Sequence, residues 1–347
     1  MKPKPSVSTE ETHQSGENAS DLNTNPLISY VVVTYNRPDD LAEAIDSILD
    51  QRYRSIEVIV VSNSTDDTHE LFEKGGRFEG QVRYYHFPER MGVPRARNVG
   101  YEHAEGDIIV TIDDDAVIQD PTATDRILSL FHKYDDIGVL AFQCRDFHTD
   151  GINPHETPDP PTFDMTPTTQ YRATNFVGVG NAIRRSVIDD VGSYPEDFVY
   201  GFEEMDLSFR VHDAGYDILY TPDVVVHHKK SPAARMTDVE TQERLVENRI
   251  KLAIRNLPWR YVLCTTIIWS VYGLLLTRRV SSLLRIYRRL YEEQEMTEQR
   301  CVVTNQTISR IKSRNTMLFC WWYGPHPCRI IGPNRDVGRL FWETRTS

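Results

Sequence analysis

The chain has 347 residues, 39% of them hydrophobic and 26% charged, which is the composition of an ordinary globular protein with a sizeable core. Its formal net charge of -12 argues against a nucleic-acid binder, because such proteins carry a basic domain or a long basic stripe. The five cysteines are scattered without a CxxC pair. The sequence therefore predicts neither a disulfide framework nor a zinc ribbon, and a reducing cytosol is the simpler location.

Residues 1–26 differ from the rest of the chain. They contain many Ser, Thr, Asn and Glu side chains and few apolar ones, so we expect a disordered tail without the apolar segment of a signal peptide. The folded part is therefore expected to begin at Leu27.

The segment that follows Leu27 predicts a βαβ unit. Residues 28–33 are an apolar run rich in β-branched side chains, typical of a parallel strand that is covered on both faces. Pro38 begins a segment with apolar residues at helical spacing, and residues 56–61 repeat the strand pattern. The crossover connection is expected to be right-handed.

Further strands are expected at 82–87, 107–112 and 137–147, and helices at 93–104 and 121–136. Residues 27–147 therefore predict an α/β/α sandwich, Rossmann-like, with a mostly parallel sheet. Ligands of such sheets bind beyond the carboxyl ends of the strands, where residues 34–37, 62–66 and 113–115 stand.

Residues 148–170 are rich in Pro and Thr and have no periodic pattern, which is typical of a functional or disordered loop. After them the sequence predicts a helix at 202–213, closed by Gly215, and a strand at 218–226. We expect residues 148–235 to complete the domain that begins at residue 27.

The C-terminal region, residues 236–347, has a different character. Residues 261–277 carry no charge and have arginines on both sides, but they lie at the lower edge of the roughly 20 apolar residues that a transmembrane helix needs. The arginine-rich segment after them is amphipathic, a pattern that favours an anionic membrane surface. A buried core helix followed by a solvated one is the alternative. We expect a helical region associated with a membrane, either peripherally or through a single span near 261–277.

Three consecutive aspartates, Asp113, Asp114 and Asp115, directly follow the strand predicted at 107–112. Neighbouring carboxylates repel one another and disfavour burial unless a positive charge compensates them. Carboxylates suit Mg²⁺ or Mn²⁺, above all when a substrate diphosphate supplies further ligands. Because alternate residues of an extended strand share a face, we expect Asp113 and Asp115 to face the cation and Asp114 to point away.

Five segments, in order, resemble the family-two glycosyltransferases, which are nucleotide-sugar-dependent enzymes with the GT-A fold. They are VVVTYNRP, SNSTDDT, RMGVPRARNVG, TIDDDAVI and the long segment from VGVGNAIRRSV to VVVHHK, and the likeness extends roughly over residues 27–230. The resemblance implies a GT-A catalytic domain at 27–235, with a nucleotide-sugar half at 27–147 and an acceptor half at 148–235.

The resemblance also implies places for the donor nucleotide. Residues expected to line its base and ribose are Thr34, Tyr35 and Arg37, and Asn63 stands where many relatives have an aspartate. Arg95 and Asn98 would lie by the diphosphate or the central aspartate. The alternative for these two is an ordinary helix N-terminus with polar surface groups.

For the acceptor half, the helix FEEMDLSFR implies that Glu204 is the catalytic base, at a position where relatives carry Asp or Glu. Glu203, about 100° around the helix, is placed among the substrate-binding residues. The alternative is a solvated acidic face with an ion pair between Asp206 and Arg210, four residues apart.

His228 stands six positions after Pro222, as the metal-coordinating histidine of the family does, so the resemblance implies a Mn²⁺ or Mg²⁺ site made of Asp113, Asp115 and His228. The adjacent His227 is expected to face the other side of the strand. The basic residues that follow either meet phosphates or form a solvated turn; they are Lys229, Lys230 and Arg235.

The resemblance implies an inverting glycosyltransferase that moves a sugar from a nucleotide-diphosphate sugar to an acceptor hydroxyl. One alternative is a non-catalytic nucleotide-sugar-binding scaffold on the same fold. Its signs would be Asn63 and Glu204, which replace an aspartate found in many relatives at the first position and in some at the second. A nucleotidyltransferase is less favoured, because TYNRPDD lacks a Gly-rich phosphate loop.

The expected acceptor is a lipid-linked or cell-surface glycan, because the C-terminal region has the pattern of a membrane-associated segment. Such an enzyme would act at the cytoplasmic face of the cell membrane, in the assembly of a polysaccharide or of a precursor for protein N-glycosylation.

Overall fold

The computed structural model describes residues 25–153, 156–158, 166–231, 238–292 and 300–314. Residues 1–24 of the predicted tail lie outside the described residues, and so does Arg235.

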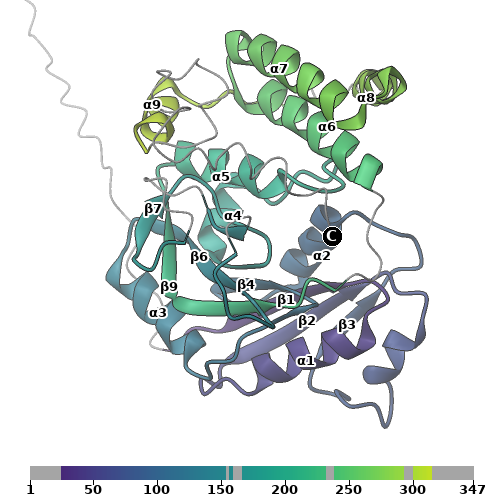
Figure 1. Ribbon diagram of the computed structural model, residues 1–347. Helices are drawn as coiled ribbons and strands as arrows, with labels where there is room; N and C mark the ends of the chain where they lie inside the picture. Colours follow the sequence, from purple (N-terminus) through teal and green to yellow (C-terminus); the bar gives the residue numbers. More distant parts are fainter. Residues whose placement is uncertain (1–24, 154–155, 159–165, 232–237, 293–299, 315–347) are drawn as a thin grey trace, which may run out of the picture.

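Within the described residues, a mixed sheet of nine strands forms the middle layer (Figure 1). Its order is β3-β2-β1-β4-β8-β6-β9-β5, with β7 paired to β9. The strands are β1 (Ile28–Thr34), β2 (Ile56–Ser62), β3 (Arg83–His86), β4 (Ile108–Asp113), β5 (Ala116–Val117), β6 (Ile137–Asp146), β7 (Tyr171–Ala173), β8 (Gly180–Arg184) and β9 (Asp217–His228).

The first half of the sheet is parallel, as the sequence predicts. β1 pairs in parallel with β2 and β4, and β2 with β3, so the carboxyl ends of these four strands lie at one edge. Nearly all residues of β1, β2 and β4 are buried, which explains their continuous apolar runs. The predicted α/β sandwich is therefore confirmed.

Beyond β4 the sheet becomes mixed. β8 lies antiparallel between β4 and β6, while β6 and β9 are parallel. The short strands β5, β7 and β8 are not predicted from the sequence, because each has at most five residues. β9 is longer than predicted and its last residues pair with β5, opposite Ala116 and Val117.

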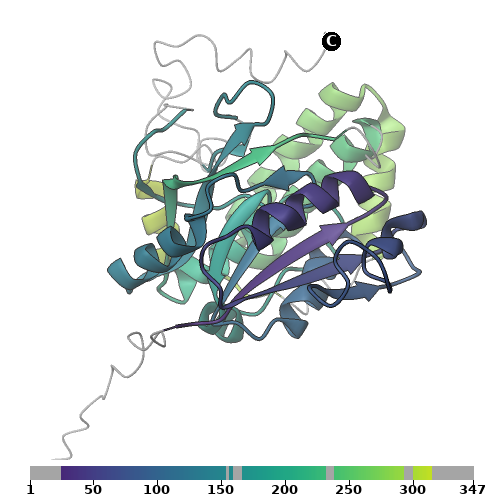
Figure 2. The ribbon, with the colours of Figure 1, turned by 90° about the horizontal axis from the view of Figure 1, so that it is seen from below.

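Helices cover both faces of the sheet. One face packs against α1 and α3, and the other against α2, α4 and α5 (Figure 1); Figure 2, from below, shows α1 crossing the first of these faces. Their bounds are α1 (Pro38–Leu49), α2 (Val93–His103), α3 (Ala123–Lys133), α4 (Arg185–Val191) and α5 (Glu203–Asp213), with a 3-10 turn η1 at Asp67–Leu71.

A further layer of helices packs on α5. It consists of α6 (Asp238–Asn256), α7 (Trp259–Thr277), α8 (Val280–Glu292) and α9 (Asn305–Ser313). Phe209 of α5 shares a buried cluster with Leu252 of α6 and Ile308 of α9. Of the helices in the described ranges, α7 alone is long and apolar enough to cross a membrane, judged by length and composition.

Candidate active site

Four elements meet where the parallel strands end: β4 with its aspartates, α2, α5 and the end of β9. Asp113 is the last residue of β4, and its backbone N–H donates to the carbonyl of Val179 at 3.2 Å. The pairing of Ala116 with His228 brings the end of β9 beside the aspartates. The fold thus gathers residues from distant parts of the sequence.

Arg97 of α2 is the central cation of this site. Its guanidinium donates to Glu204 Oε1 at 2.8 Å, to Asp113 Oδ1 at 3.0 Å and to the carbonyl of Gly178 at 3.2 Å. Burial disfavours the charged guanidinium, but Glu204 and Asp113 outweigh it and raise the pKa of Arg97. Sequence reasoning missed Arg97, although it stands in the motif RMGVPRARNVG.

Neither Arg95 nor Asn98 contacts an aspartate of the site in the structure. Arg95 is 58% exposed, and its Nε lies 3.8 Å from Glu196 Oε2 rather than beside an aspartate of β4. Asn98 is buried and pairs both ends of its amide with the backbone of Tyr194, each at 2.9 Å. Arg95 and Arg97 are two residues apart on a helix, so they point about 200° apart and only one can face the strand end.

The aspartates have different partners. Asp114 accepts from Thr34 Oγ1 and from Arg37 Nη1, both at 2.8 Å. Burial, partly offset by Arg37 and reinforced by Asp115, raises the pKa of Asp114 to about 7. Asp115 is equally buried, but the hydrogen bond from His228 outweighs burial and lowers its pKa.

His228 lies between two carboxylates. Its Nε2 is 3.1 Å from Asp115 Oδ1, and its Nδ1 is 3.0 Å from Glu156 Oε1. Although burial opposes the charged ring, these contacts raise the pKa of His228 to about 12. His227 points elsewhere, with Nε2 3.1 Å from Asp150 Oδ1, as the alternation along a strand predicts. Glu156 is not among the site residues predicted from the sequence.

The predicted metal ligands form a compact group. One ligand atom from each of Asp113, Asp115 and His228 lies within 4.8 Å of the other two. Two carboxylates and an imidazole suit a divalent cation such as Mn²⁺ or Mg²⁺, which would take the place of the proton on His228 Nε2. Glu156 would then accept from Nδ1, an arrangement common among metal-binding histidines.

The two glutamates that begin α5 differ in exposure. The side chain of Glu204 is 16% exposed, whereas Glu203 is buried and its Oε2 has no hydrogen-bond partner among the described residues. Burial and the neighbouring Glu204 raise the pKa of Glu203 to about 8. The predicted pair of Asp206 and Arg210 is present at 3.0 Å, but Asp206 is buried, not solvated.

The residues predicted to line the nucleotide lie around the ends of β1 and β2. Arg90 stacks over the Tyr35 ring at 4.7 Å, and Arg37 Nη1 lies 3.3 Å from Asp115 Oδ2. Asn63 is buried and braces a loop: its amide donates to the carbonyls of Phe87 and Glu89 at 3.1 and 2.8 Å. Asn63 is thus committed to backbone contacts, where a base contact was expected.

The basic residues after His228 do not form one patch. Lys229 Nζ lies 3.0 Å from Asp40 and 2.8 Å from Glu43, so it fastens the end of β9 to α1. Lys230 is 4.0 Å from Glu156 Oε1. Lys229 therefore forms ion pairs with α1, and it fits neither of the two predictions, a phosphate contact or a solvated turn.

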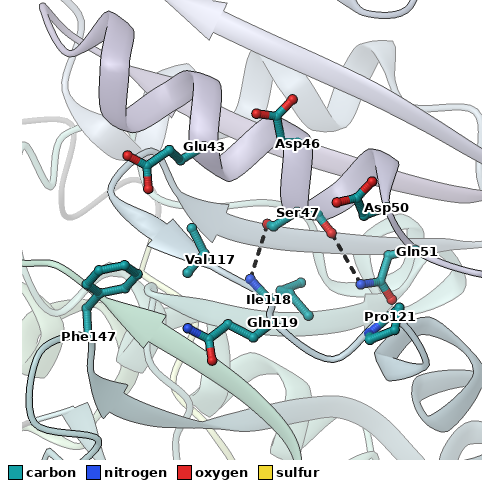
Figure 3. A pocket seen from close by; sticks show the side chains of 10 residues that line it. All are labelled: Glu43, Asp46, Ser47, Asp50, Gln51, Val117, Ile118, Gln119, Pro121 and Phe147. Atoms are coloured by element: carbon teal, nitrogen blue, oxygen red, sulfur yellow. Dashed lines mark hydrogen bonds between the residues drawn. The ribbon is translucent and has the colours of Figure 1, made fainter.

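A hollow of about 320 Å³ lies between α1 and the segment 117–121 (Figure 3). Its acidic lining residues are Glu43, Asp46 and Asp50, and no predicted site residue contributes to it. The convergence of charged groups at the strand ends, rather than this hollow, defines the candidate site.

Comparison with known families shows which enzymes this chain resembles. Residues 29–192 match the family model of glycosyl transferase family 2. The matched residues, just under half of the chain, are similar to this family. Together with the glycosyltransferase relatives, this match shows an enzyme of the glycosyltransferase class, and the matched segment contains Arg97 and the three consecutive aspartates 113–115.

Curated glycosyltransferases resemble this chain over limited stretches. GlyG of Streptococcus pneumoniae serotype 4, a glycosyltransferase, is 35% identical over 95 residues, which are 27% of this chain and 32% of GlyG. The chain thus spans about a third of the length of this relative.

Two solved structures share the fold of this chain. PcManGT, a mannosyltransferase of Pyrobaculum calidifontis in complex with GDP-Man and Mn²⁺, has a TM-score of 0.51 and 18% identity over 90% of this chain and 92% of its own. TarS of S. aureus, residues 1–349 in complex with UDP-GlcNAc, has a TM-score of 0.54 and 15% identity over 92% of both chains.

Gly178 gives a direct test of the candidate site. A Cβ at this position would stand 2.2 Å from Glu204 Oε1 and 2.5 Å from Arg97 Nη2. Both atoms end long side chains, so Gly178→Ala should displace them without unfolding the protein. We expect kcat to fall on the order of 10²-fold, as misplaced catalytic groups do, at an unchanged melting temperature.

Gly151→Ala is the matched control, because its Cβ would meet only Thr149 Oγ1, at 3.5 Å. Full activity in Gly178→Ala would show that the contact between Arg97 and Glu204 is dispensable.

Glu203 predicts a pH dependence of stability. Its raised pKa means that the folded protein binds a proton more tightly than the unfolded chain between about pH 4.5 and 8. The free energy of unfolding therefore falls as pH rises through this window, and Glu203→Gln should remove more than about 1 kcal/mol of that fall. Urea unfolding at several pH values measures it, with the exposed Glu102→Gln as control. Parallel curves for wild type and Glu203→Gln would contradict the burial of this carboxyl group.

Proposed function

We propose that the protein is an inverting glycosyltransferase that moves a sugar from a nucleotide-diphosphate sugar to an acceptor hydroxyl, with Glu204 as the base. The single observation that carries the proposal is that Arg97 contacts both Glu204 of α5 and Asp113 of β4. The partly exposed carboxylate of the acceptor half is thereby held beside the aspartates of the donor half.

In the proposed reaction, Glu204 accepts the proton of the acceptor hydroxyl as its oxygen attacks the anomeric carbon of the donor sugar. The bond from this carbon to the diphosphate breaks on the opposite side, and the nucleoside diphosphate leaves. A single displacement inverts the anomeric centre, and no covalent intermediate with the enzyme forms.

Arg97 and Gly178 position the base in this scheme. The guanidinium fixes one carboxylate oxygen at 2.8 Å, and the missing side chain of Gly178 leaves the space in which both groups lie. Arg37 and Tyr35, at the end of β1, would bind the nucleotide near Asp113 and Asp115. A divalent cation held by Asp113, Asp115 and His228 would supply positive charge to the leaving diphosphate.

The cation and the donor class draw support from the solved structures of this fold. PcManGT holds Mn²⁺ together with GDP-Man, and TarS holds UDP-GlcNAc. The donors differ in both base and sugar, so the class of donor is a nucleotide-diphosphate sugar.

We propose a lipid-linked or cell-surface glycan as the acceptor, used at the cytoplasmic face of the cell membrane. Val199 and Tyr200 are exposed apolar residues immediately before α5, where an acceptor would approach Glu204. The helices α7 and α8 provide the membrane contact of this proposal.

A panel of nucleotide sugars incubated with Mn²⁺ and acceptor candidates, followed by mass spectrometry, tests the function. Transfer of one sugar, with the opposite anomeric configuration in the product by NMR, is the expected result. Retention of configuration, or donor binding without any turnover, would overturn the proposal; the second outcome would point to a binding scaffold.

A further inference from the structure

Helix α7 exposes a long apolar stripe to solvent. Leu263, Ile267, Val271 and Leu275 recur every four residues, and each is more than half exposed. Such a row lies on one side of a helix. The opposite side packs inward, with Tyr261, Val262 and Thr265 buried. These exposed apolar side chains form a continuous surface instead of standing singly. Continuous apolar surfaces of this kind are typical of interaction sites.

Helix α8 continues the same surface. Its exposed apolar side chains are Val280, Leu284, Tyr287 and Tyr291, again on one side of the helix. Tyr287 lies 2.5 Å from Ser270 of α7, between their hydroxyl oxygens, so the two stripes adjoin. Figure 1 shows α7 and α8 together at the outer end of the molecule, beyond α6.

The charge of this hairpin is opposite to that of the whole chain. Residues 259–292 contain six arginines and one glutamate, whereas the chain carries a net charge of -12. Arg260, Arg278 and Arg279 are exposed at the two ends of α7, and none has a carboxylate partner within the described ranges. Apolar side chains bordered by unpaired arginines complement a bilayer with anionic headgroups.

The packing of α7 against α6 and α8 argues against a transmembrane orientation. α6 buries Glu243, Glu247 and Lys251 and pairs them with each other or with α8: Lys251 Nζ is 3.2 Å from Glu247 Oε1, and Arg289 Nε is 2.5 Å from Glu247 Oε2. Arg285 pairs with Glu243. If α7 crossed a bilayer with this packing intact, these charges would enter the hydrocarbon, where ionised groups are strongly disfavoured.

We propose that the exposed faces of α7 and α8 form one docking surface for an anionic lipid bilayer, with α7 lying along the membrane plane instead of crossing it. The inference rests on the proposed membrane location, and it is independent of the sugar chemistry.

The docking surface is connected to the candidate base through α6. Asn248 donates to the carbonyls of Tyr200 and Gly201 at 2.8 and 2.9 Å, directly before α5. Asn256 donates to Asp206 of α5 at 2.6 Å. A bilayer bound to α7 and α8 would therefore hold the helix of Glu204 at a fixed height above the lipid surface.

Sedimentation of the full chain with phosphatidylcholine vesicles, with and without phosphatidylserine, tests the docking. We expect binding that depends on phosphatidylserine and weakens with salt. Replacing Leu263 and Leu275 by Glu should lower the affinity at least about tenfold, and replacing Arg278 and Arg279 by Ala should lower it roughly fivefold per arginine. The matched controls are Val302→Glu and Arg126→Ala, which are exposed residues outside the hairpin.

A depth measurement separates lying along the membrane from crossing it. Fluorophores are attached to single cysteines placed at Leu263, Ile267 or Leu275, and lipids with quenchers at different depths report their position. Cys144 is buried and can remain, while Cys264, Cys301, Cys320 and Cys328 are replaced by serine.

The same shallow depth at all three positions is the expected result. Depths that increase steadily along α7, or that are greatest at Ile267, would overturn the in-plane orientation. Absence of vesicle binding in a chain that still transfers sugar would overturn the docking and leave the proposed function intact, whereas docking without transfer would overturn only the function. A dimer that forms without lipid and is dissociated by the Leu263 and Leu275 changes, with no vesicle binding, would assign the surface to a second copy.

Discussion

Replacing Glu204 by Gln is expected to lower kcat by roughly 10²- to 10⁴-fold, the usual loss when a general base is removed. Gln keeps the shape of the side chain and an oxygen that accepts from Arg97, so the fold and the affinity for the donor should not change. Steady-state kinetics with a nucleotide sugar, together with calorimetric donor titration, measure the two quantities separately.

Glu203→Gln is the matched control, because it makes the same chemical change one residue earlier. The carboxyl group of Glu203, a predicted substrate-binding residue, is buried 3.9 Å from Arg97 Nη1 and does not reach the solvent side of α5 as Glu204 does. We expect its effect on kcat to be far smaller. An equal loss in both variants, or full activity in Glu204→Gln, would remove Glu204 from the role of base.

Asp115→Asn is expected to weaken the Mn²⁺-dependent binding of the donor by at least about 100-fold, since changes that only support a metal ligand already cost 10- to 100-fold. The substitution removes one of the two carboxylates that would bind a shared cation. The same carboxylate contacts His228, so this contact changes as well. Donor titrations with Mn²⁺ and with a chelator measure the metal-dependent part.

Asp114→Asn provides the comparison at the neighbouring position. Its amide can still accept from Arg37 and can donate to the hydroxyl of Thr34, and the raised pKa of Asp114 shows that burial disfavours its charge. Donor affinity should therefore change little. A loss as large as that in Asp115→Asn would show that the central aspartate takes part in metal or donor binding.

The sequence alone predicted the parts of the site that depend on local pattern. The end of β4 was predicted from its apolar run, and the ligand atoms of Asp113, Asp115 and His228 do lie together. Strand alternation does not explain the aspartates, because β4 ends at Asp113 and Arg37 contacts both Asp114 and Asp115 in the turn that follows. The helix that carries Glu204 was predicted within one residue of its observed start at Glu203.

Contacts between distant segments were not predictable in the same way. Arg95 and Arg97 are the same residue type in the same helix, so the local sequence does not distinguish them. The orientation of α2 on the sheet determines that Arg97 faces Asp113. Asn98 looked like a ligand, but its amide is taken up by Tyr194, 96 residues away. Glu156 lies 72 residues from His228 in a segment without periodic pattern, so no local signal indicated their contact.

In the proposed function, Glu204 and the group of Asp113, Asp115 and His228 form the catalytic site. The most direct test measures the release of nucleoside diphosphate from a panel of nucleotide sugars with Mn²⁺. It compares the wild type with Glu204→Gln and Asp115→Asn. We predict turnover by the wild type that a chelator abolishes, donor binding without turnover in Glu204→Gln, and loss of metal-dependent binding in Asp115→Asn. Turnover at the wild-type rate in both variants would contradict this site.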